Sequence, residues 1–340
     1  MSNRARRDTA SAKPSPRASA TMLPWFAPGS PVPLYLAPMA GFTDDAFRAL
    51  CKQHGAGVLV TEFAQCEGLV RGGESAWRVL RIPGNQRPAG VQIFGAKPDF
   101  MALAATLVQE RIRPDFIDLN FGCPACAVTD QNAGSSLLRF PALLQEIAVR
   151  VVQAIGSTTP VTAKIRIGWD RQSINAQEIV RRLEDAGVEA IAIHGRTRAQ
   201  GYSGEADWGE IARAVASTRI PIIGNGDIDA PGTAIERLRE SGVRALMVGR
   251  AALGNPWLFS ALRAALDGRP IPPPPSQTER LSTMLDYAAA LLAGASNASI
   301  RHLLPKLQAF THGLPGSRVL RNRLSSCQNL ADLRALVSCP

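Results

Sequence analysis

The sequence predicts an α/β protein in which a (β/α)₈ barrel, the TIM barrel, is followed by a small C-terminal helical domain. Eight short apolar runs alternate with longer segments of helical spacing up to Trp257. Beyond Trp257 a proline-rich stretch leads into helical patterns alone. Strands that alternate with helices predict a parallel sheet, closed as a barrel or, as the alternative, open and doubly wound.

The eight apolar runs are the predicted strands, because parallel strands covered on both faces are continuously hydrophobic. Between them, segments such as 176–186 and 233–241 show helical spacing. Glycines at 55, 187 and 242 stand where a helix commonly ends in a left-handed residue. The runs are 34–37, 58–61, 90–94, 116–120, 161–165, 190–194, 220–225 and 245–248.

Composition and charge divide the chain into four parts. Residues 1–30 are expected to be a basic, disordered extension, and residues 31–267 the barrel. Residues 268–277 form a stiff proline-rich linker, and residues 278–340 a helical domain. Of the net charge of +10, residues 1–30 carry +4 (five basic, one acidic) and residues 276–340 carry +4 (seven basic, three acidic). Such basic ends suit a polyanion such as a nucleic acid, although a solvated surface explains them equally well.

Several classes of protein are disfavoured. No apolar run is long enough to span a membrane, and the arginine-rich first residues do not resemble a secretory signal, so a cytoplasmic location is expected. Six scattered cysteines do not form the dense pattern of a disulfide scaffold. Cys123 and Cys126 lack the second pair or histidines of a zinc site, so no metal is expected. Nothing points to an obligate protein partner.

Chemically capable side chains stand where the predicted strands end. The carboxyl ends of barrel strands meet at one mouth, so these residues are expected to converge there. Cys123 is the most informative of them, because Gly122 and Pro124 hold it on a tight loop directly after a buried strand. The set comprises Pro38, Met39, Ala40, Glu62, Gln92, Asn120, Cys123, Lys164, Arg166, His194, Asn225, Gly226, Asp227, Gly249 and Arg250.

The last two predicted strands indicate a phosphate site. Glycine-containing loops follow both strands, at Gly226 and Gly249, and leave backbone N–H groups free to bind a phosphate. Arg250 adds a charged donor. A dinucleotide fold is disfavoured, because no G-x-G-x-x-G lies between an early strand and its helix. A phosphate-bearing cofactor or substrate is therefore expected.

At this point the residues show a family resemblance. Seven short segments occur in the order seen in bacterial tRNA-dihydrouridine synthases. They are LAPMAGFTD (36–44), VQIFG (91–95), NFGCP (120–124), KIR (164–166), HGRTR (194–198), NGD (225–227) and VGR (248–250). The chain resembles that family from about Leu34 to Trp257 and more loosely beyond. Two features depart from the family pattern. One is the N-terminal extension, and the other is ACA (125–127), where relatives commonly place a lysine.

The resemblance implies a role for each residue of the mouth. Cys123 would be the catalytic proton donor. The residues implied to bind FMN are Pro38, Met39 and Ala40 along the flavin, Gln92 and Lys164 by hydrogen bonds, His194 at its edge or near the phosphate, and Asn225, Gly226, Asp227, Gly249 and Arg250 at the ribityl phosphate. The residues expected to contact tRNA are Asn120, Arg166, Arg196 and Arg198 at the barrel rim, and Arg301, Lys306 and Arg318 in the tail.

The implied reaction is an FMN-dependent reduction of the carbon 5–carbon 6 double bond of D-loop uridines in tRNA, with NADPH or NADH as the reductant. Hydride would come from flavin N5 and the proton from Cys123. The enzyme would hold the D-loop and elbow region of the tRNA, with the basic tail and with Arg196 and Arg198 at the barrel rim as the source of affinity. The alternative is that the tail only caps the barrel.

Three alternatives remain open at this point. A dihydroorotate-dehydrogenase-like enzyme would also combine an FMN barrel with pyrimidine chemistry, but has no need of the basic tail. A non-catalytic tRNA-binding protein would keep the tail and lose the constellation at the mouth. A phosphate-binding barrel without flavin would be colourless.

Overall fold

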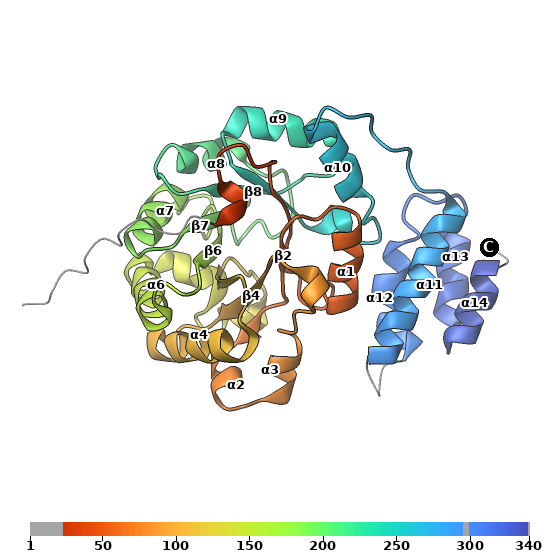
Figure 1. Cartoon of the computed structure of the whole chain (residues 1–340), viewed down its shortest axis with the longest axis horizontal. Coiled ribbons are helices and arrows are strands. Elements are labelled where there is room, and N and C mark those ends of the chain that lie inside the picture. The colour runs from red at the N-terminus through yellow and green to blue at the C-terminus, as the bar shows by residue number, and fades with distance from the viewer. Residues whose placement is uncertain (1–22, 295–298, 339–340) are drawn as a thin grey trace, which may run out of the picture.

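The computed structural model describes residues 23–294 and 299–338 and contains a closed parallel barrel (Figure 1). The sheet order is β1-β9-β8-β7-β6-β5-β4-β2, and every pairing is parallel. The Leu36 N–H donates to the Val58 carbonyl at 3.0 Å, which joins the two ends of that order. The expected (β/α)₈ fold is confirmed. The strands are β1 (Leu34–Leu36), β2 (Leu59–Val60), β3 (Ala64–Gln65), β4 (Ala89–Phe94), β5 (Phe116–Phe121), β6 (Val161–Arg166), β7 (Ala190–His194), β8 (Ile222–Asn225) and β9 (Ala245–Val248).

The second predicted strand is shorter in the structure and is followed by a further short strand. β2 and β3 both pair with β4, with residues 61–63 between them outside the ladder. There the Thr61 hydroxyl accepts the Gln92 N–H at 3.2 Å, so a side chain takes the place of a backbone acceptor. The apolar run from residue 58 to 61 did not reveal this interruption.

Helices surround the barrel, and the longer ones such as α6 and α7 bury one apolar stripe against the strands. In α7, for example, the buried residues Ile179, Val180 and Leu183 recur at helical spacing, and Gly187 follows the helix with a φ of +89°. The helices are α1 (Asp45–Gln53), α2 (Cys66–Val70), α3 (Glu74–Arg78), α4 (Pro98–Ile112), α5 (Cys126–Thr129), α6 (Pro141–Ile155), α7 (Ala176–Asp185), α8 (Trp208–Val215), α9 (Pro231–Ser241) and α10 (Leu258–Leu266), with 3₁₀ turns η1 (Pro24–Phe26), η2 (Gly84–Gln86), η3 (Gly134–Arg139) and η4 (Arg250–Ala252).

Alternation along each strand decides which side chains enter the barrel. On β5, Ile117 and Leu119 belong to the outer core between sheet and helices, whereas Phe116 belongs to a separate inner cluster. Successive side chains point to opposite faces, so Asp118 and Asn120 share the inner face with Phe116. The barrel interior is therefore apolar at its base and polar toward the mouth.

The base of the barrel is covered by residues that we expected to be part of a disordered extension. Leu23 and Phe26 are buried, and the Trp25 indole N–H donates to the Tyr35 hydroxyl at 2.6 Å. The Trp25 ring also packs on Phe116 at 5.8 Å. The expected boundary at residue 30 is therefore too late, because these apolar side chains have a core to join. Residues 1–22 lie outside the described residues.

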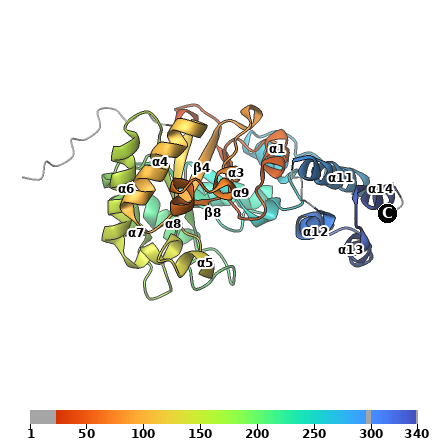
Figure 2. The same ribbon diagram turned by 90° about the horizontal axis from the view of Figure 1, so that it is seen from below.

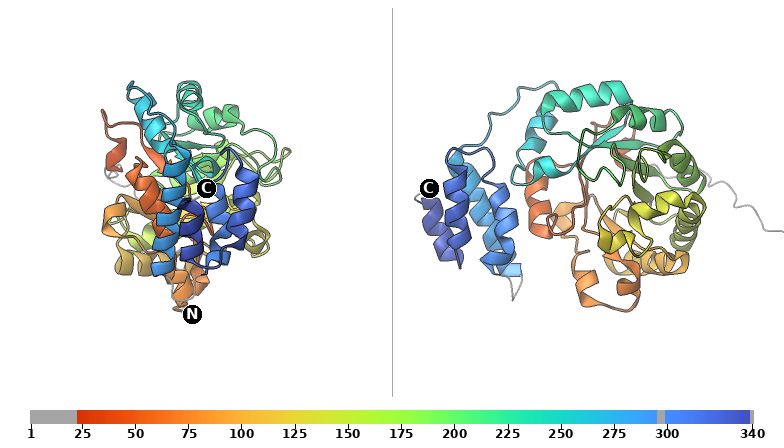
Figure 3. Two further views of the ribbon diagram at one scale, coloured as in Figure 1. Left: turned by 90° about the vertical axis from the view of Figure 1, so that its right-hand side faces the viewer. Right: turned by 180° about the vertical axis from the view of Figure 1, so that it is seen from behind.

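The tail forms a helical bundle beside α1 (Figures 1 and 2). Its helices are α11 (Gln277–Gly294), α12 (Ile300–Ala309), α13 (Ser317–Ser326) and α14 (Leu330–Ser338). The chain reaches it from α10 through an extended segment without helix or strand, residues 269–276, which Figure 3 shows running from the barrel to the bundle. Among the described residues, no helix is both long enough and apolar enough to cross a membrane.

Asp44 joins the tail to the barrel. Its carboxylate accepts the Phe47 N–H at 2.9 Å as the N-cap of α1. The same carboxylate accepts hydrogen bonds from the Tyr287 hydroxyl at 2.7 Å and from the Lys306 ammonium at 2.6 Å. Gly254 contributes a close backbone approach, since a Cβ there would lie 2.2 Å from the Ala309 carbonyl carbon. Because residues 37–43 run directly from β1 to Asp44, this interface is attached to the loop at the barrel mouth.

Candidate active site

A cavity of about 980 Å³ opens at the carboxyl ends of the strands. That volume lies at the upper end of the range for small-molecule and cofactor sites. The cavity collects residues from loops far apart in the sequence, as barrel closure requires. All the residues expected to bind the cofactor line it, namely Pro38, Met39, Ala40, Gln92, Lys164, His194, Asn225, Gly226, Asp227, Gly249 and Arg250, and so do Asn120, Cys123, Arg166 and Arg198.

The floor of the cavity is a directed chain of hydrogen bonds that starts at Asp118. The Thr162 hydroxyl donates to one carboxylate oxygen at 2.5 Å, and the Gln92 amide donates to the other at 2.6 Å. The Gln92 amide oxygen in turn accepts from Asn120 at 2.9 Å. The Asn120 amide oxygen then accepts the Cys123 N–H at 2.9 Å.

This chain has one polarity because an ionised Asp118 only accepts hydrogen bonds. The Gln92 amide therefore turns its N–H toward Asp118 and its oxygen toward Asn120, which determines the orientation of the Asn120 amide. Burial raises the pKa of Asp118, while the hydrogen bonds from Thr162 and Gln92 and the charge of Lys164 oppose that rise. Sequence reasoning missed Asp118. The sequence feature that could have revealed it is a carboxylate within an otherwise apolar strand, two residues before Asn120.

Cys123 lies on the loop between β5 and α5 and is half-buried. The Asn120 amide holds its N–H, and the Ser135 hydroxyl donates to its carbonyl at 2.8 Å. Burial raises the pKa of the Cys123 thiol, while an N–H of Ala125 and the charges of Arg166 and Lys164 act in the opposite direction. The thiol is therefore protonated at neutral pH. Cys126 is exposed, and both cysteines are free thiols.

Lys164 and His194 lie on neighbouring strands of the cavity wall. Among the described residues no protein group accepts a hydrogen bond from the Lys164 ammonium. Burial and the nearby Arg166 lower the pKa of Lys164 to about 8, with Asp118 acting in the opposite direction. Burial and the surrounding cations strongly lower the pKa of His194, so the imidazole is neutral.

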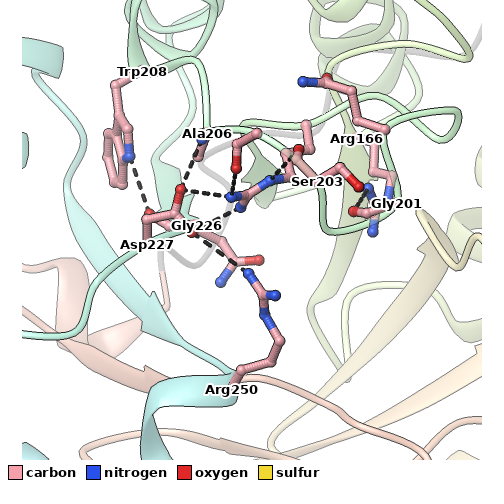
Figure 4. Close-up of polar contacts among 12 residues, drawn as sticks. Arg166, Gly201, Ser203, Ala206, Trp208, Gly226, Asp227 and Arg250 are labelled. Carbon is pink, nitrogen blue, oxygen red and sulfur yellow. Dashed lines mark hydrogen bonds and ion pairs between the residues drawn. The ribbon is translucent and has the colours of Figure 1, made fainter.

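The loops after β8 and β9 meet around Asp227 (Figure 4). Its carboxylate accepts two hydrogen bonds from the Arg196 guanidinium at 2.8 Å each, and the Arg250 guanidinium lies 3.5 Å away. Although burial raises the pKa of Asp227, the bonds from Arg196 and from the Ala206 N–H lower it more. The ionised carboxylate thus pairs with both guanidinium groups, and the role expected for Asp227 in phosphate binding stays a prediction.

The backbone beside Asp227 provides such groups. The N–H groups of Gly226, Gly249 and Arg250 donate to no protein acceptor in the part of the chain that the structure describes. Gly226 has a φ of +124°, and a Cβ there would lie 2.6 Å from that of Ala206, so a larger residue does not fit. Free N–H groups next to an arginine make a suitable anion site.

Three residues expected to contact tRNA have other partners. Arg196 is only 3% exposed, and besides Asp227 it donates to the carbonyls of Ser203 and Gly204. Arg166 is 2% exposed and donates to the carbonyls of Gly122, Thr197 and Gly201. Lys306 is bound to Asp44 at the interface between barrel and tail. Each of these three cations is thus already engaged by the protein, and its contact with tRNA stays a prediction.

The remaining expected contacts lie in two places. Arg198 lines the cavity, whereas Arg301 and Arg318 are exposed on the helical bundle and do not line it. Tyr202 also lines the cavity, with its side chain exposed and the Arg250 guanidinium 4.3 Å from its ring, and sequence reasoning missed it. In residues 23–294 and 299–338 no group of three or more His, Cys, Asp or Glu side chains is placed to hold a metal ion.

Comparison with known protein families shows which family the chain belongs to. The sequence model of the dihydrouridine synthase (Dus) family matches residues 35–339. The chain belongs to the dihydrouridine synthase family. It is 42% identical over 258 residues to tRNA-dihydrouridine synthase B of Xanthomonas axonopodis pv. citri, covering 76% of this chain and 77% of that protein. It is 40% identical over 300 residues to tRNA-dihydrouridine synthase B of Pseudomonas aeruginosa, covering 87% and 89%. The family resemblance of the sequence is confirmed.

Solved structures support the fold alone. Histamine dehydrogenase from Rhizobium sp. 4-9 shares 14% identity at a TM-score of 0.51, over 75% of this chain and 48% of that one. A 2-naphthoyl-CoA reductase complex shares 14% identity at a TM-score of 0.54, over 70% and 50%. The chain thus spans about half of each of these larger proteins.

Proposed function

We propose that this protein is a tRNA-dihydrouridine synthase, a flavin-dependent oxidoreductase that reduces the carbon 5–carbon 6 double bond of uridines in tRNA with NADPH as the electron source. The observation that carries the proposal is one cavity lined by a protonated thiol, a half-buried ammonium without a protein partner and a cluster of free backbone N–H groups, in a member of the dihydrouridine synthase family. The two relatives described above, 42% and 40% identical to this chain, are named tRNA-dihydrouridine synthase B, which supports the proposal.

FMN fits the residues that line the cavity. A half-buried ammonium without a protein acceptor, Lys164, suits a ligand that carries negative charge. The free N–H groups of Gly249 and Arg250 suit the ribityl phosphate. Pro38 and Met39 would form the apolar wall against the ring. When bound, FMN would take a hydride from the nicotinamide and pass it to carbon 6 of uracil.

Cys123 would donate the proton that completes the reduction. Hydride addition at carbon 6 places negative charge on carbon 5, which then needs an acid nearby. Because burial raises the pKa of Cys123, the thiol keeps its proton at neutral pH and can act as that acid. Asn120 holds the Cys123 N–H, and Asp118 sets the orientation of Asn120 through Gln92. We therefore assign Asp118 a positioning role.

The tRNA would be held by exposed cations outside the cavity. A uridine reaches a cavity of this kind only when it leaves the base stack, which costs a few kcal/mol that contacts elsewhere must offset. Arg301 and Arg318 are exposed on the helical bundle and are free to contact phosphates of the D-loop and elbow region. Binding through such contacts weakens steeply with salt.

The direct test compares Cys123→Ala with Cys126→Ala, since Cys126 is an exposed thiol only three positions further along the chain, at the start of α5. Each purified protein is assayed for flavin absorption, for NADPH and NADH oxidation and for dihydrouridine in unmodified tRNA. We expect all three proteins to be yellow, and only Cys123→Ala to lose product.

Each contrary outcome identifies a different error. A colourless parent would refute the FMN assignment. A yellow parent that oxidises NADPH without forming dihydrouridine would refute the substrate. Full activity in Cys123→Ala, or equal losses in both variants, would remove Cys123 from the role of proton donor.

A further inference from the structure

Three side chains from separate loops form a stack on the barrel rim. Trp169 follows β6, Arg139 ends the turn after β5, and Arg198 follows β7. The Arg139 guanidinium carbon lies 4.3 Å from the Trp169 ring centroid, and that of Arg198 lies 4.5 Å from it. We call these three residues the rim stack. Both contacts lie well within cation–π distance.

Hydrogen bonds join the loops that carry the rim stack. The Arg198 N–H donates to the Gly168 carbonyl at 3.0 Å, and the Ala199 N–H donates to the Trp169 carbonyl at 2.8 Å. The Asn175 amide donates to the Leu138 carbonyl at 2.8 Å, next to Arg139. These bonds cross-link the backbones of the three loops, and the Trp169 ring positions the two guanidinium groups before any ligand binds.

The rim stack carries positive charge that the protein does not neutralise. Across the described ranges, neither Arg139 nor Arg198 forms an ion pair, and the buried Nε of Arg198 has no acceptor. Since both guanidinium groups contact one ring, they lie within about 9 Å of each other, which is close to a Debye length at physiological salt. Arg196, by contrast, is neutralised by Asp227.

The position of the rim stack separates it from the phosphate site. β5, which precedes Arg139, lies across the sheet order from β9, which precedes the free N–H groups of Gly249 and Arg250. Arg139 does not line the cavity, although Arg198 does. The exposed Phe140 ring lies beside Arg139, whose guanidinium carbon is 5.4 Å from its centroid. Paired guanidinium groups next to an exposed aromatic ring are typical of surfaces that bind phosphates and stack bases.

We infer that the rim stack binds the RNA backbone beside the uridine that enters the cavity, with Arg139 on a phosphate and Trp169 holding both arginines in place. This inference rests on the proposed function, because it names the surface of the barrel on which the substrate lies. It shifts RNA recognition at the rim from the buried Arg166 and Arg196 to Arg139 and Arg198.

The test is tRNA binding by the holoenzyme of Arg139→Gln, measured by filter binding at several salt concentrations. Loss of one phosphate contact should make the negative slope of the log association constant against log salt shallower by roughly 0.7 to 0.9. It should also weaken the affinity at physiological salt about fivefold. FMN content should match that of the parent, because Arg139 lies outside the cavity. Arg219→Gln is the matched control, since that side chain is 95% exposed on the loop before β8, at the other end of the barrel.

Two tryptophan variants test the role of the stack. We expect Trp169→Leu to weaken binding as Arg139→Gln does and Trp169→Phe to restore it, with flavin content and melting temperature reported for each. The inference would be overturned if Arg139→Gln leaves the salt slope unchanged, or if it weakens tRNA binding no more than Arg219→Gln does. If instead the parent neither binds tRNA nor forms dihydrouridine, the proposed function itself fails.

Discussion

Asp44 should be one of the most sensitive residues outside the cavity, and Asp44→Ala tests this. Loss of the N-cap of α1 costs about 1 kcal/mol. The change also leaves the Lys306 ammonium and the Tyr287 hydroxyl without their acceptor, at about 1 to 3 kcal/mol for each. Both members of the ion pair are more than four-fifths buried, with 18% and 17% of their side chains exposed, so solvent screens little of this loss. We expect the free energy of unfolding to fall by about 3 to 5 kcal/mol.

Urea unfolding followed by circular dichroism measures this effect. Asp44→Asn keeps a capping oxygen and should cost clearly less than Asp44→Ala. Asp45→Ala is the control, because its carboxylate is 40% exposed and lies 3.7 Å from an exposed arginine, an arrangement worth at most about 1 kcal/mol. The reasoning is refuted if Asp44→Ala costs no more than Asp45→Ala. It is also refuted if Lys306→Met lowers the salt slope of tRNA binding and leaves stability unchanged.

Three further predictions concern the barrel. FMN affinity of the apoprotein should fall as pH rises from 7 to 9, because Lys164, with a pKa of about 8, loses its charge in that range; Lys164→Met should bind more weakly and flatten the profile in a fluorescence titration. Alkylation of Cys123 in the RNA-free protein should accelerate only at a higher pH than alkylation of a free thiol, since burial raises the pKa of the Cys123 thiol, and acceleration at a lower pH than for a free thiol would contradict the role of proton donor. Gly90→Ala should cost at least about 1 to 3 kcal/mol in urea unfolding, because its Cβ would lie 2.2 Å from the Phe116 ring, whereas Gly232→Ala, with open space around it, should be neutral.

The barrel and the identity of its mouth followed from local sequence. The apolar runs predicted the strands because a parallel strand covered on both faces is hydrophobic along its whole length. The residues expected to bind the cofactor all line one cavity, since each stands at a strand end and barrel closure brings those ends together. The N-terminal boundary was placed wrongly because Leu23 and Phe26 are buried by contacts with residues far along the chain.

The sequence by itself determined the fold class, the family and the place of the thiol, because these depend on periodicity and on order along the chain. Only the tertiary structure decided which cations are free. Arg196 and Arg198 are two positions apart in one motif, yet one is bonded to Asp227 and the other stacks on Trp169 without an ion pair among the described residues. Lys306, in the same basic tail as Arg301, is bound to Asp44. A charge acquires its role from the partners within a few ångströms of it, and those partners come from other loops.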